Sequence, residues 1–260
     1  MRDPWAYTPI EPTEPTQLID PRRWRFVAPR TVETVAGLAY LPMHMLVVPI
    51  LLSIVFMLSG QDYYDNALFN LLYMLTGTVY LTHFMRRYLG ESFTRFRQFG
   101  QDNLWVIPLG YGITFAANIA IAIVLSLFAG ELANPNQEAI EEVITQSFLP
   151  ALLMTVVLAP IVEELLFRGA IFAPLRKKNR ILAYAVSTFL FAFVHIAGFL
   201  FFAPPSELLP VMLLYIPAGI TFAWVYEKSG SIWTAIALHA LWNLIATLLA
   251  FLPDLPYYPY

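Results

Sequence analysis

Stretches of about 20 mostly apolar residues follow one another along this 260-residue chain, and an α-helix needs about that length to cross a bilayer. Inside the hydrocarbon every backbone polar group must be satisfied internally, which leaves helices as the natural way to span it. Charged residues make up only 13% of the sequence, roughly half the content of a soluble domain. The sequence therefore predicts an all-α, polytopic transmembrane helical bundle. About seven spans are expected, near residues 36–59, 66–85, 104–129, 147–172, 181–203, 208–226 and 231–252.

The charges between the predicted spans alternate in sign along the chain. Arginine and lysine cluster before the first span, after the second and after the fourth, whereas the other connecting loops are acidic. By the positive-inside rule, this pattern predicts a cytoplasmic N-terminus and an external C-terminus. In a prokaryotic source the expected location is the cytoplasmic membrane. The lipid bilayer is thus an expected partner, while a net charge of -3 without a basic block predicts no nucleic-acid partner.

Composition divides the chain into parts. Residues 1–35 are polar and proline-rich, residues 36–130 hold the N-terminal spans, residues 147–252 hold the later spans and residues 253–260 form a short tail. Segment 88–103 mixes phenylalanine with arginine, which predicts either an amphipathic helix on the cytoplasmic interface or an ordinary loop. The chain has no cysteine, which excludes disulfides, thiolate metal sites and a cysteine nucleophile.

Three charged residues interrupt the fourth predicted span, at Glu163, Glu164 and Arg168. An ionisable side chain near a bilayer centre costs about 2.5 to 3.5 kcal/mol on insertion scales, so such residues normally face the protein interior. Glu164 and Arg168 have the spacing and order of a helical ion pair, whereas Glu163 is rotated about 100° away and lacks that partner. Glu164 and Arg168 are therefore expected to be structural and Glu163 chemical. An ion pair reaching the cytoplasmic face is the alternative. Pro160 should free a backbone carbonyl one turn earlier and kink the helix.

Two histidines of the later spans each share a helix face with another residue one turn away. Phe191 precedes His195 by one turn, and His239 precedes Asn243 by one turn. Phe191 is expected to give structural support to the site. As alternatives, a histidine in an apolar helix is commonly a packing residue, Phe191 can be ordinary core, and Asn243 can serve as an interhelical hydrogen-bonding group. Counted along the helices from the flanking basic residues, however, Glu163, His195, His239 and Asn243 lie at a similar depth, which predicts that they converge.

A glutamate, two histidines and an asparagine can transfer protons and stabilise an oxyanion, as hydrolysis by an activated water requires. Zinc is the alternative, with Glu163, His195 and His239 as ligands. No H-E-x-x-H motif is present, and asparagine stands one turn after His239 where a second histidine ligand would be expected. The sequence therefore predicts a site without metal or other cofactor. His44 and His83 lack polar companions at helical spacing and are expected to be structural.

Residues 149–246 resemble a known family, the CAAX-prenyl-protease and bacteriocin-processing membrane proteins. This family is also called Abi or CPBP and includes the Ras-converting-enzyme type of protease. Its motif E-E-x-x-x-R is present at residues 163–168, F-x-x-x-H at residues 191–195, and H-x-x-x-N at residues 239–243, in the family's order. Three motifs in order on three apolar helices make a specific match. The resemblance implies that residues 147–252 form a CPBP-like catalytic helical core.

The same resemblance implies a glutamate-dependent intramembrane endopeptidase that hydrolyses a membrane-associated peptide or protein. Glu163 and His195 would activate water, while His239 and Asn243 would stabilise the tetrahedral oxyanion. The alternative within this family is a non-proteolytic membrane protein, such as an immunity or sequestering factor that binds a peptide or protein. A proton-coupled transporter is a third interpretation, which the lack of an internal repeat disfavours.

Overall fold

The computed structural model describes residues 26–60, 66–100, 103–129 and 134–251. Residues 1–25 of the predicted N-terminal segment and the predicted tail lie outside these described residues. The described residues form helices and no strand, which confirms the predicted all-α fold.

Several of the α-helices follow one another directly, joined by short π-helical or 3-10 segments. The first group comprises α1 (Thr31–Pro42), η1 (Met43–Val47), α2 (Val48–Leu58), α3 (Asn66–Phe84), α4 (Arg86–Arg95), η2 (Phe96–Gly100) and α5 (Val106–Ala129). The second comprises α6 (Pro135–Gln146), α7 (Phe148–Leu152), η4 (Leu153–Leu158), α8 (Ala159–Glu164), η5 (Leu165–Phe172) and α9 (Ala173–Arg176). The third comprises α10 (Arg180–Ala197), η6 (Gly198–Phe201), α11 (Pro205–Leu213), α12 (Ile216–Ser229) and α13 (Ile232–Phe251).

Six helical stretches in the described part of the chain are long and apolar enough to cross a membrane. They are Thr31–Leu58, Val106–Phe128, Phe148–Arg176, Arg180–Phe201, Pro205–Ser229 and Ile232–Phe251. The remaining predicted span, near residues 66–85, coincides with α3, a 19-residue helix that is less apolar and packs against α1 and α8. The polytopic bundle of about seven spans is therefore confirmed.

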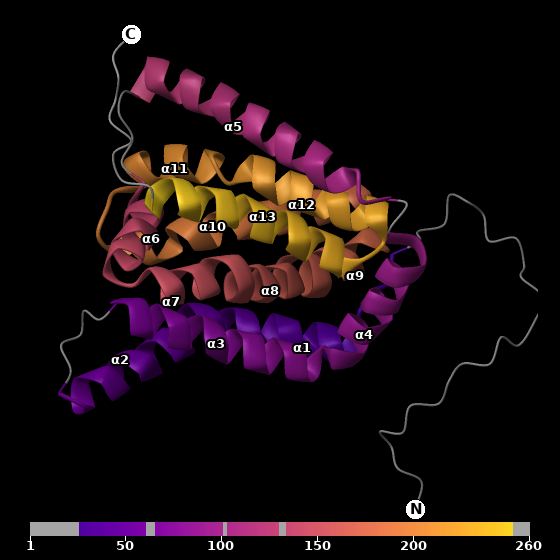
Figure 1. The fold of residues 1–260 in the computed structure, drawn as a ribbon, viewed down its shortest axis with the longest axis horizontal. Helices are drawn as coiled ribbons and strands as arrows, with labels where there is room; N and C mark the ends of the chain where they lie inside the picture. The colour runs from indigo at the N-terminus through magenta and orange to yellow at the C-terminus, as the bar shows by residue number, and fades with distance from the viewer. Residues whose placement is uncertain (1–25, 61–65, 101–102, 130–133, 252–260) are drawn as a thin grey trace, which may run out of the picture.

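The stretch from α7 to α9 runs through the middle of the bundle. In Figure 1 it lies between α1 and α3 on one side and α10 and α13 on the other. Some 56% of its apolar window is buried, against 6% for the window in α5, which lies at the outer edge. The charged residues of α8 and η5 therefore face protein rather than hydrocarbon, which removes the cost of inserting them into lipid.

Pro160 shapes the helix just before the two glutamates. The preceding segment η4 is π-helical, and the Ala159 N–H donates to the carbonyl of Met154, five residues earlier. The next donor in this register would be the backbone nitrogen of Pro160, which carries no hydrogen, so the carbonyl of Thr155 receives no bond from it. The carbonyl that the proline was predicted to free is therefore that of Thr155.

The segment that follows α3 is helical and packs on the later spans. Ser92 of α4 accepts from the Ile232 N–H at 2.8 Å, and the Trp233 indole donates to the carbonyl of Leu89 at 3.0 Å. Gly230, at a φ of 73°, ends α12 in the left-handed conformation that glycine adopts without strain. This short reversal turns the chain directly into α13 and so brings the H-x-x-x-N motif back beside α8.

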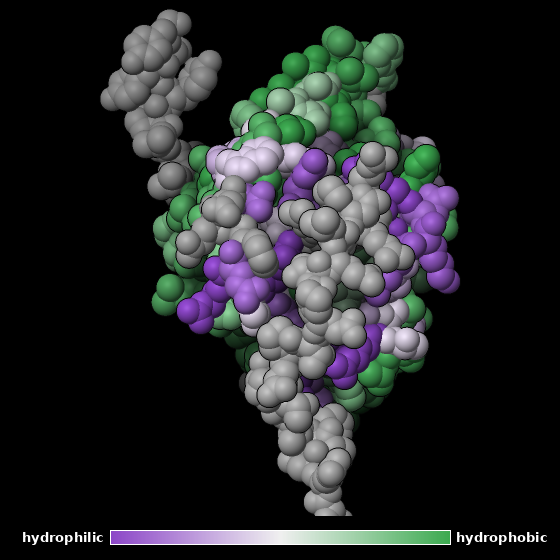
Figure 2. Space-filling view, turned by 90° about the vertical axis from the view of Figure 1, so that its right-hand side faces the viewer, coloured by the Kyte–Doolittle hydropathy of each residue, from purple (hydrophilic) through white to green (hydrophobic). Residues whose placement is uncertain are grey.

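The two ends of the bundle differ in charge. Exposed basic residues gather at the end formed by α4, α9 and the α12–α13 turn, on the right of Figure 1. Figure 2 looks onto this end and shows hydrophilic residues across its face with hydrophobic residues along the flanks. The acidic helix α6 lies at the opposite end. A polar face at the end of an apolar bundle is the arrangement of a protein whose flanks contact lipid.

Candidate active site

Arg168 lies at the centre of the site, fully buried. Its Nη1 donates to Glu164 Oε1 at 2.9 Å, and neither side chain is accessible to solvent. Nη2 donates to the carbonyl of Gly219 at 3.1 Å, and the guanidinium carbon lies 4.5 Å from the ring centroid of Phe191 and 5.3 Å from that of Phe222. The ion pair predicted from the spacing is thus present, in the interior and not at the cytoplasmic face. It ties η5 to α10 and α12.

Glu164 has a second partner that the sequence did not reveal. The same Oε1 atom lies 2.9 Å from His239 Nδ1. A carboxylate paired with arginine can only accept, so His239 donates through Nδ1–H, and Nε2 of the neutral ring then carries the lone pair. This Nε2 lies 3.8 Å from Glu163 Oε2. Glu164 therefore connects Arg168 with His239 and fixes which ring nitrogen of the histidine faces Glu163.

His195 also turns its Nε2 atom toward Glu163, but a different hydrogen bond fixes its ring. Its Nδ1 lies 2.7 Å from the carbonyl of Phe191, which can only accept, so Nδ1 carries the hydrogen. Nε2 lies 3.8 Å from Glu163 Oε2. The ring lies between Phe191, at a centroid distance of 4.8 Å, and Tyr215, at 4.2 Å. Phe191 therefore contacts both the arginine and the histidine, in the supporting position expected of it.

Glu163 is the group on which both histidines converge. Its side chain is 12% exposed, and Oε2 is buried with no hydrogen-bond partner among the described residues. Because successive residues of a helix point about 100° apart, Glu163 turns away from the Arg168 pair that holds its neighbour Glu164. The structure thus brings Glu163, His195 and His239 together, at separations too long for direct hydrogen bonds and short enough for one water molecule to bridge.

Asn243 lies on α13 and is hydrogen-bonded to the Thr155 carbonyl, the one that Pro160 leaves free. Its Nδ2 donates to the Thr155 carbonyl at 2.8 Å, which makes it an interhelical hydrogen-bonding group between α13 and η4. A primary amide carries two N–H donors, and this bond uses one of them. The Thr155 hydroxyl in turn lies 3.0 Å from that of Thr247. Asn243 lines the same cavity as Glu163.

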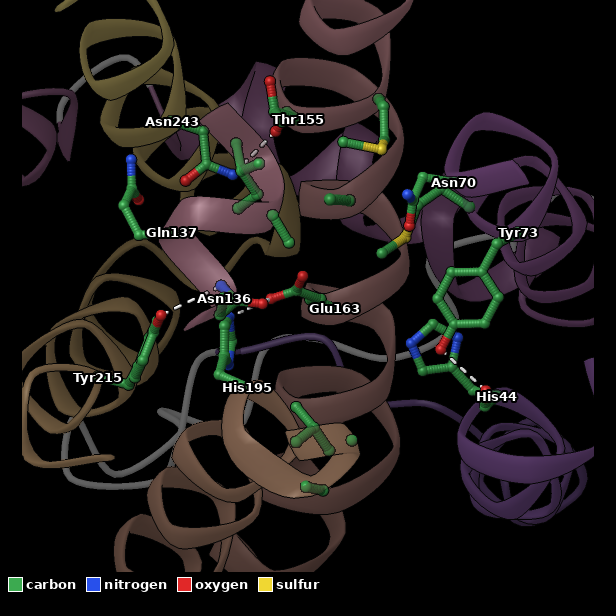
Figure 3. A pocket seen from close by; sticks show the side chains of 18 of the residues that line it. His44, Asn70, Tyr73, Asn136, Gln137, Thr155, Glu163, His195, Tyr215 and Asn243 are labelled. Atoms are coloured by element: carbon green, nitrogen blue, oxygen red, sulfur yellow. Dashed lines mark hydrogen bonds and ion pairs between the residues drawn. The ribbon is translucent and has the colours of Figure 1, made fainter. Parts of the chain in front are cut away.

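These side chains open into a cavity of about 690 Å³. Figure 3 shows Glu163 between two walls: His195, Tyr215 and Asn136 on one side, and His44, Tyr73 and Asn70 on the other. His44, expected to be structural, is buried and stacks on Tyr73 at 4.4 Å, and it also lines this cavity. A largely apolar pocket of this size with a few convergent polar groups has the character of a ligand-binding site. His83, by contrast, does not line the cavity.

The arrangement does not resemble a compact metal site. Within the described residues, no three histidine or acidic side chains converge closely enough to hold an ion. Glu163, His195 and His239 are the residues that would bind zinc if the site were metal-dependent, and the prediction of a metal-free site remains to be tested by experiment.

Comparison with known proteins shows which family the segment that carries this site resembles. Residues 145–245, which contain all three motifs, match the model of the type II CAAX prenyl endopeptidase Rce1-like family. The predicted resemblance is confirmed. The segment is thus similar to a family of membrane proteases.

Three curated bacterial proteins are similar to the chain. The putative membrane peptidase YdiL of Bacillus subtilis is 30% identical over 59% of this chain and 59% of its own length. The membrane-embedded CAAX protease MroQ of Staphylococcus aureus is 28% identical over 54% of this chain and 56% of its own length, and the UPF0177 protein YvdC of Lactococcus lactis is 26% identical over 55% and 52%. The chain thus spans less than two thirds of each relative. No solved structure matches the chain.

Proposed function

We propose that the protein is an intramembrane endopeptidase in which Glu163 acts as the general base on a water molecule. The single observation that carries the proposal is the placement of Glu163 Oε2, buried and 3.8 Å from Nε2 of both His195 and His239. A water molecule held between the carboxylate and the lone pair of His195 Nε2 would donate one hydrogen to each. Glu163 would take the proton as the water oxygen attacks a peptide carbonyl.

Stabilisation of the resulting oxyanion falls to His239 and Asn243. The second N–H of the Asn243 amide is oriented by the bond that its Nδ2 makes to Thr155. His239 can donate through Nε2 only when that atom carries a proton. The proton that Glu163 takes from the water would therefore pass to Nε2, 3.8 Å away, and the Glu163 and Glu164 carboxylates would be the counter-charges of the cationic ring. Preorganised donors at a developing oxyanion are usually the largest single contribution to catalysis of this kind. No metal takes part in this scheme.

The substrate in this proposal is a membrane-associated peptide or protein. The cavity that holds Glu163 is lined by helices of the bundle and is partly open, so a substrate segment would enter it from the bilayer or its surface. The distribution of charge favours a cytoplasmic N-terminus, with the basic end of the bundle at the cytoplasmic face of the cell membrane.

The test is cleavage of a peptide library by purified protein in lipid nanodiscs, beside Glu163→Gln and the matched control Glu207→Gln, which changes an exposed glutamate of α11. Wild type and Glu207→Gln should cleave the same peptides, and Glu163→Gln should cleave none while unfolding at the same temperature. A non-proteolytic binding protein would instead retain peptides without cleaving them, in all three forms. Full activity of Glu163→Gln would refute the assignment of the base.

A further inference from the structure

Tyr215 joins His195 to the helix that covers the cavity. Its ring stacks on the imidazole with centroids 4.2 Å apart and planes inclined by 24°. Its hydroxyl donates to Asn134 Oδ1 at 3.3 Å and accepts from Asn136 Nδ2 at 3.1 Å. Asn134 is also the N-cap of α6, since its Oδ1 accepts from the Gln137 N–H at 3.2 Å. One side chain therefore contacts the candidate catalytic histidine with its face and the start of α6 with its hydroxyl (Figure 3).

The His195 ring has one hydrogen bond and two aromatic neighbours among the described residues. The hydrogen bond runs from Nδ1 to the Phe191 carbonyl of its own helix and leaves Nε2 aimed at Glu163 without a direct bond. Phe191 is tilted by 55° to the imidazole, whereas Tyr215, from the turn between α11 and α12, lies nearly parallel to it. Tyr215 is thus the aromatic neighbour that packs on the imidazole from another element.

Helix α6 covers the cavity with one face. Asn136, Gln137 and Ile140 line the cavity, and Val143 and Ile144 are buried. The acidic residues of the same helix are exposed on its other face. Ser147, with φ of -157° and ψ of 89°, breaks the helical path between α6 and α7. The helix packs on α3, α7 and α13 as it covers the cavity, and the two asparagines at its start also bond to Tyr215.

We propose that Tyr215 is a positioning residue: it sets the plane of His195 and makes that plane depend on the placement of α6 over the cavity. The inference rests on the proposed function, because His195 is taken as the group that shares the water with Glu163. With α6 in place, the two asparagines hold the phenol and the ring lies flat on the imidazole. When α6 moves to admit a substrate segment, Tyr215 loses both hydrogen bonds, and His195 aligns again only after α6 closes. Hydrolysis is thereby confined to the covered state.

Two substitutions separate the ring from the hydroxyl. Tyr215→Leu removes the stacking and should lower kcat at least tenfold with KM changed less than threefold, since a misplacement of about 1 Å can cost roughly a hundredfold in rate. Tyr215→Phe keeps the ring but loses both hydrogen bonds to the asparagines, so it should lower kcat more than threefold but less than Tyr215→Leu does. It should also speed amide hydrogen exchange across residues 135–146, as should Asn136→Ala. The double variant should exchange no faster than Tyr215→Phe alone, because the bond that Asn136→Ala removes is already lost in Tyr215→Phe. Phe189→Leu, an exposed ring of the same helix as His195, is the control and should leave kcat unchanged.

The measurements of kcat and of amide hydrogen exchange test separate parts of the proposal. If wild type cleaves no peptide, the proposed function is wrong, and the exchange measurements still test the contact between Tyr215 and α6. Unchanged exchange in Tyr215→Phe, or additive effects in the double variant, would overturn that contact as the device that holds α6. A wild-type kcat in Tyr215→Leu, alongside an inactive Glu163→Gln, would overturn the positioning role and leave the proposed function standing.

Discussion

Replacing Glu164 with glutamine should lower the free energy of unfolding while leaving the shape of the site nearly unchanged. Glutamine keeps an oxygen that can accept from Arg168 and His239, but it removes the negative charge that compensates a guanidinium with no solvent access. Leaving one partner of a buried ion pair uncompensated costs about 3 to 5 kcal/mol. The faces of Phe191 and Phe222, which lie against the guanidinium, offset part of this cost, because a desolvated cation–π contact is worth up to about 2 kcal/mol.

We therefore expect Glu164→Gln to lose about 3 kcal/mol of unfolding free energy, the lower end of the range, or roughly a hundredfold in the ratio of folded to unfolded protein. The assay is equilibrium unfolding in a fixed detergent, with the double variant Glu164→Gln/Arg168→Met as the matched comparison. Removing both charges should recover at least half of the lost stability, since the buried cation is gone.

The double variant should nevertheless stay poorly active, because His239 no longer donates to a carboxylate. Activity and stability are thereby separated in a single protein. If Glu164→Gln unfolds with wild-type stability, or if the double variant is less stable than the single one, the Glu164–Arg168 pair is not the structural element inferred from its burial.

Three further predictions concern the mechanism and the topology. Asn243→Ala should raise the activation barrier by about 2.7 to 4 kcal/mol, seen as a hundred- to thousandfold lower kcat with little change in KM. Asn243→Asp should lower kcat further because it places a negative charge against the oxyanion. Equal kcat in the wild type and both variants would exclude the oxyanion role. Chelation should leave activity intact in protein shown to contain no zinc, whereas loss of stoichiometric zinc together with activity, and recovery of both on adding zinc, would make Glu163, His195 and His239 ligands. Reporter fusions at Gly60 and Pro205 should read external and those at Gly90 and Lys178 internal, with two contrary sites sufficient to reject the orientation.

The parts of the site that lie within one helix were predictable, and the contacts between helices were not. The spacing of Glu164 and Arg168 dictates their pairing, because residues four apart lie on the same helix face. The rise per residue placed Glu163 and the histidines at one depth. The bond from His239 to Glu164 depends on how α13 is rotated against α8, which the packing of both helices decides. No pattern in one helix encodes that rotation.

Helix α6 shows a second limit of sequence reasoning. The acidic residues near 138–142 indicate a solvated connection between spans, and one face of α6 is indeed exposed. Its other face carries Asn136 and Ile140 over the cavity, which becomes visible only when the chain on both sides of it is folded. Tyr215 was likewise one aromatic residue among many in an apolar sequence. Its importance comes from the two elements that meet on it, His195 and α6.

Pro160 and Asn243 show how one feature of the sequence can serve both structure and chemistry. The proline removes a backbone donor, and the Thr155 carbonyl that loses it in the π-helical register accepts instead from Asn243. Asn243 can therefore be both an interhelical hydrogen-bonding group and an oxyanion donor, because its amide has two N–H groups. The bond to Thr155 fixes the plane of the amide, and a fixed plane determines where the second N–H points. A donor held in this way needs little reorganisation as the oxyanion forms, which is the property that makes such donors effective.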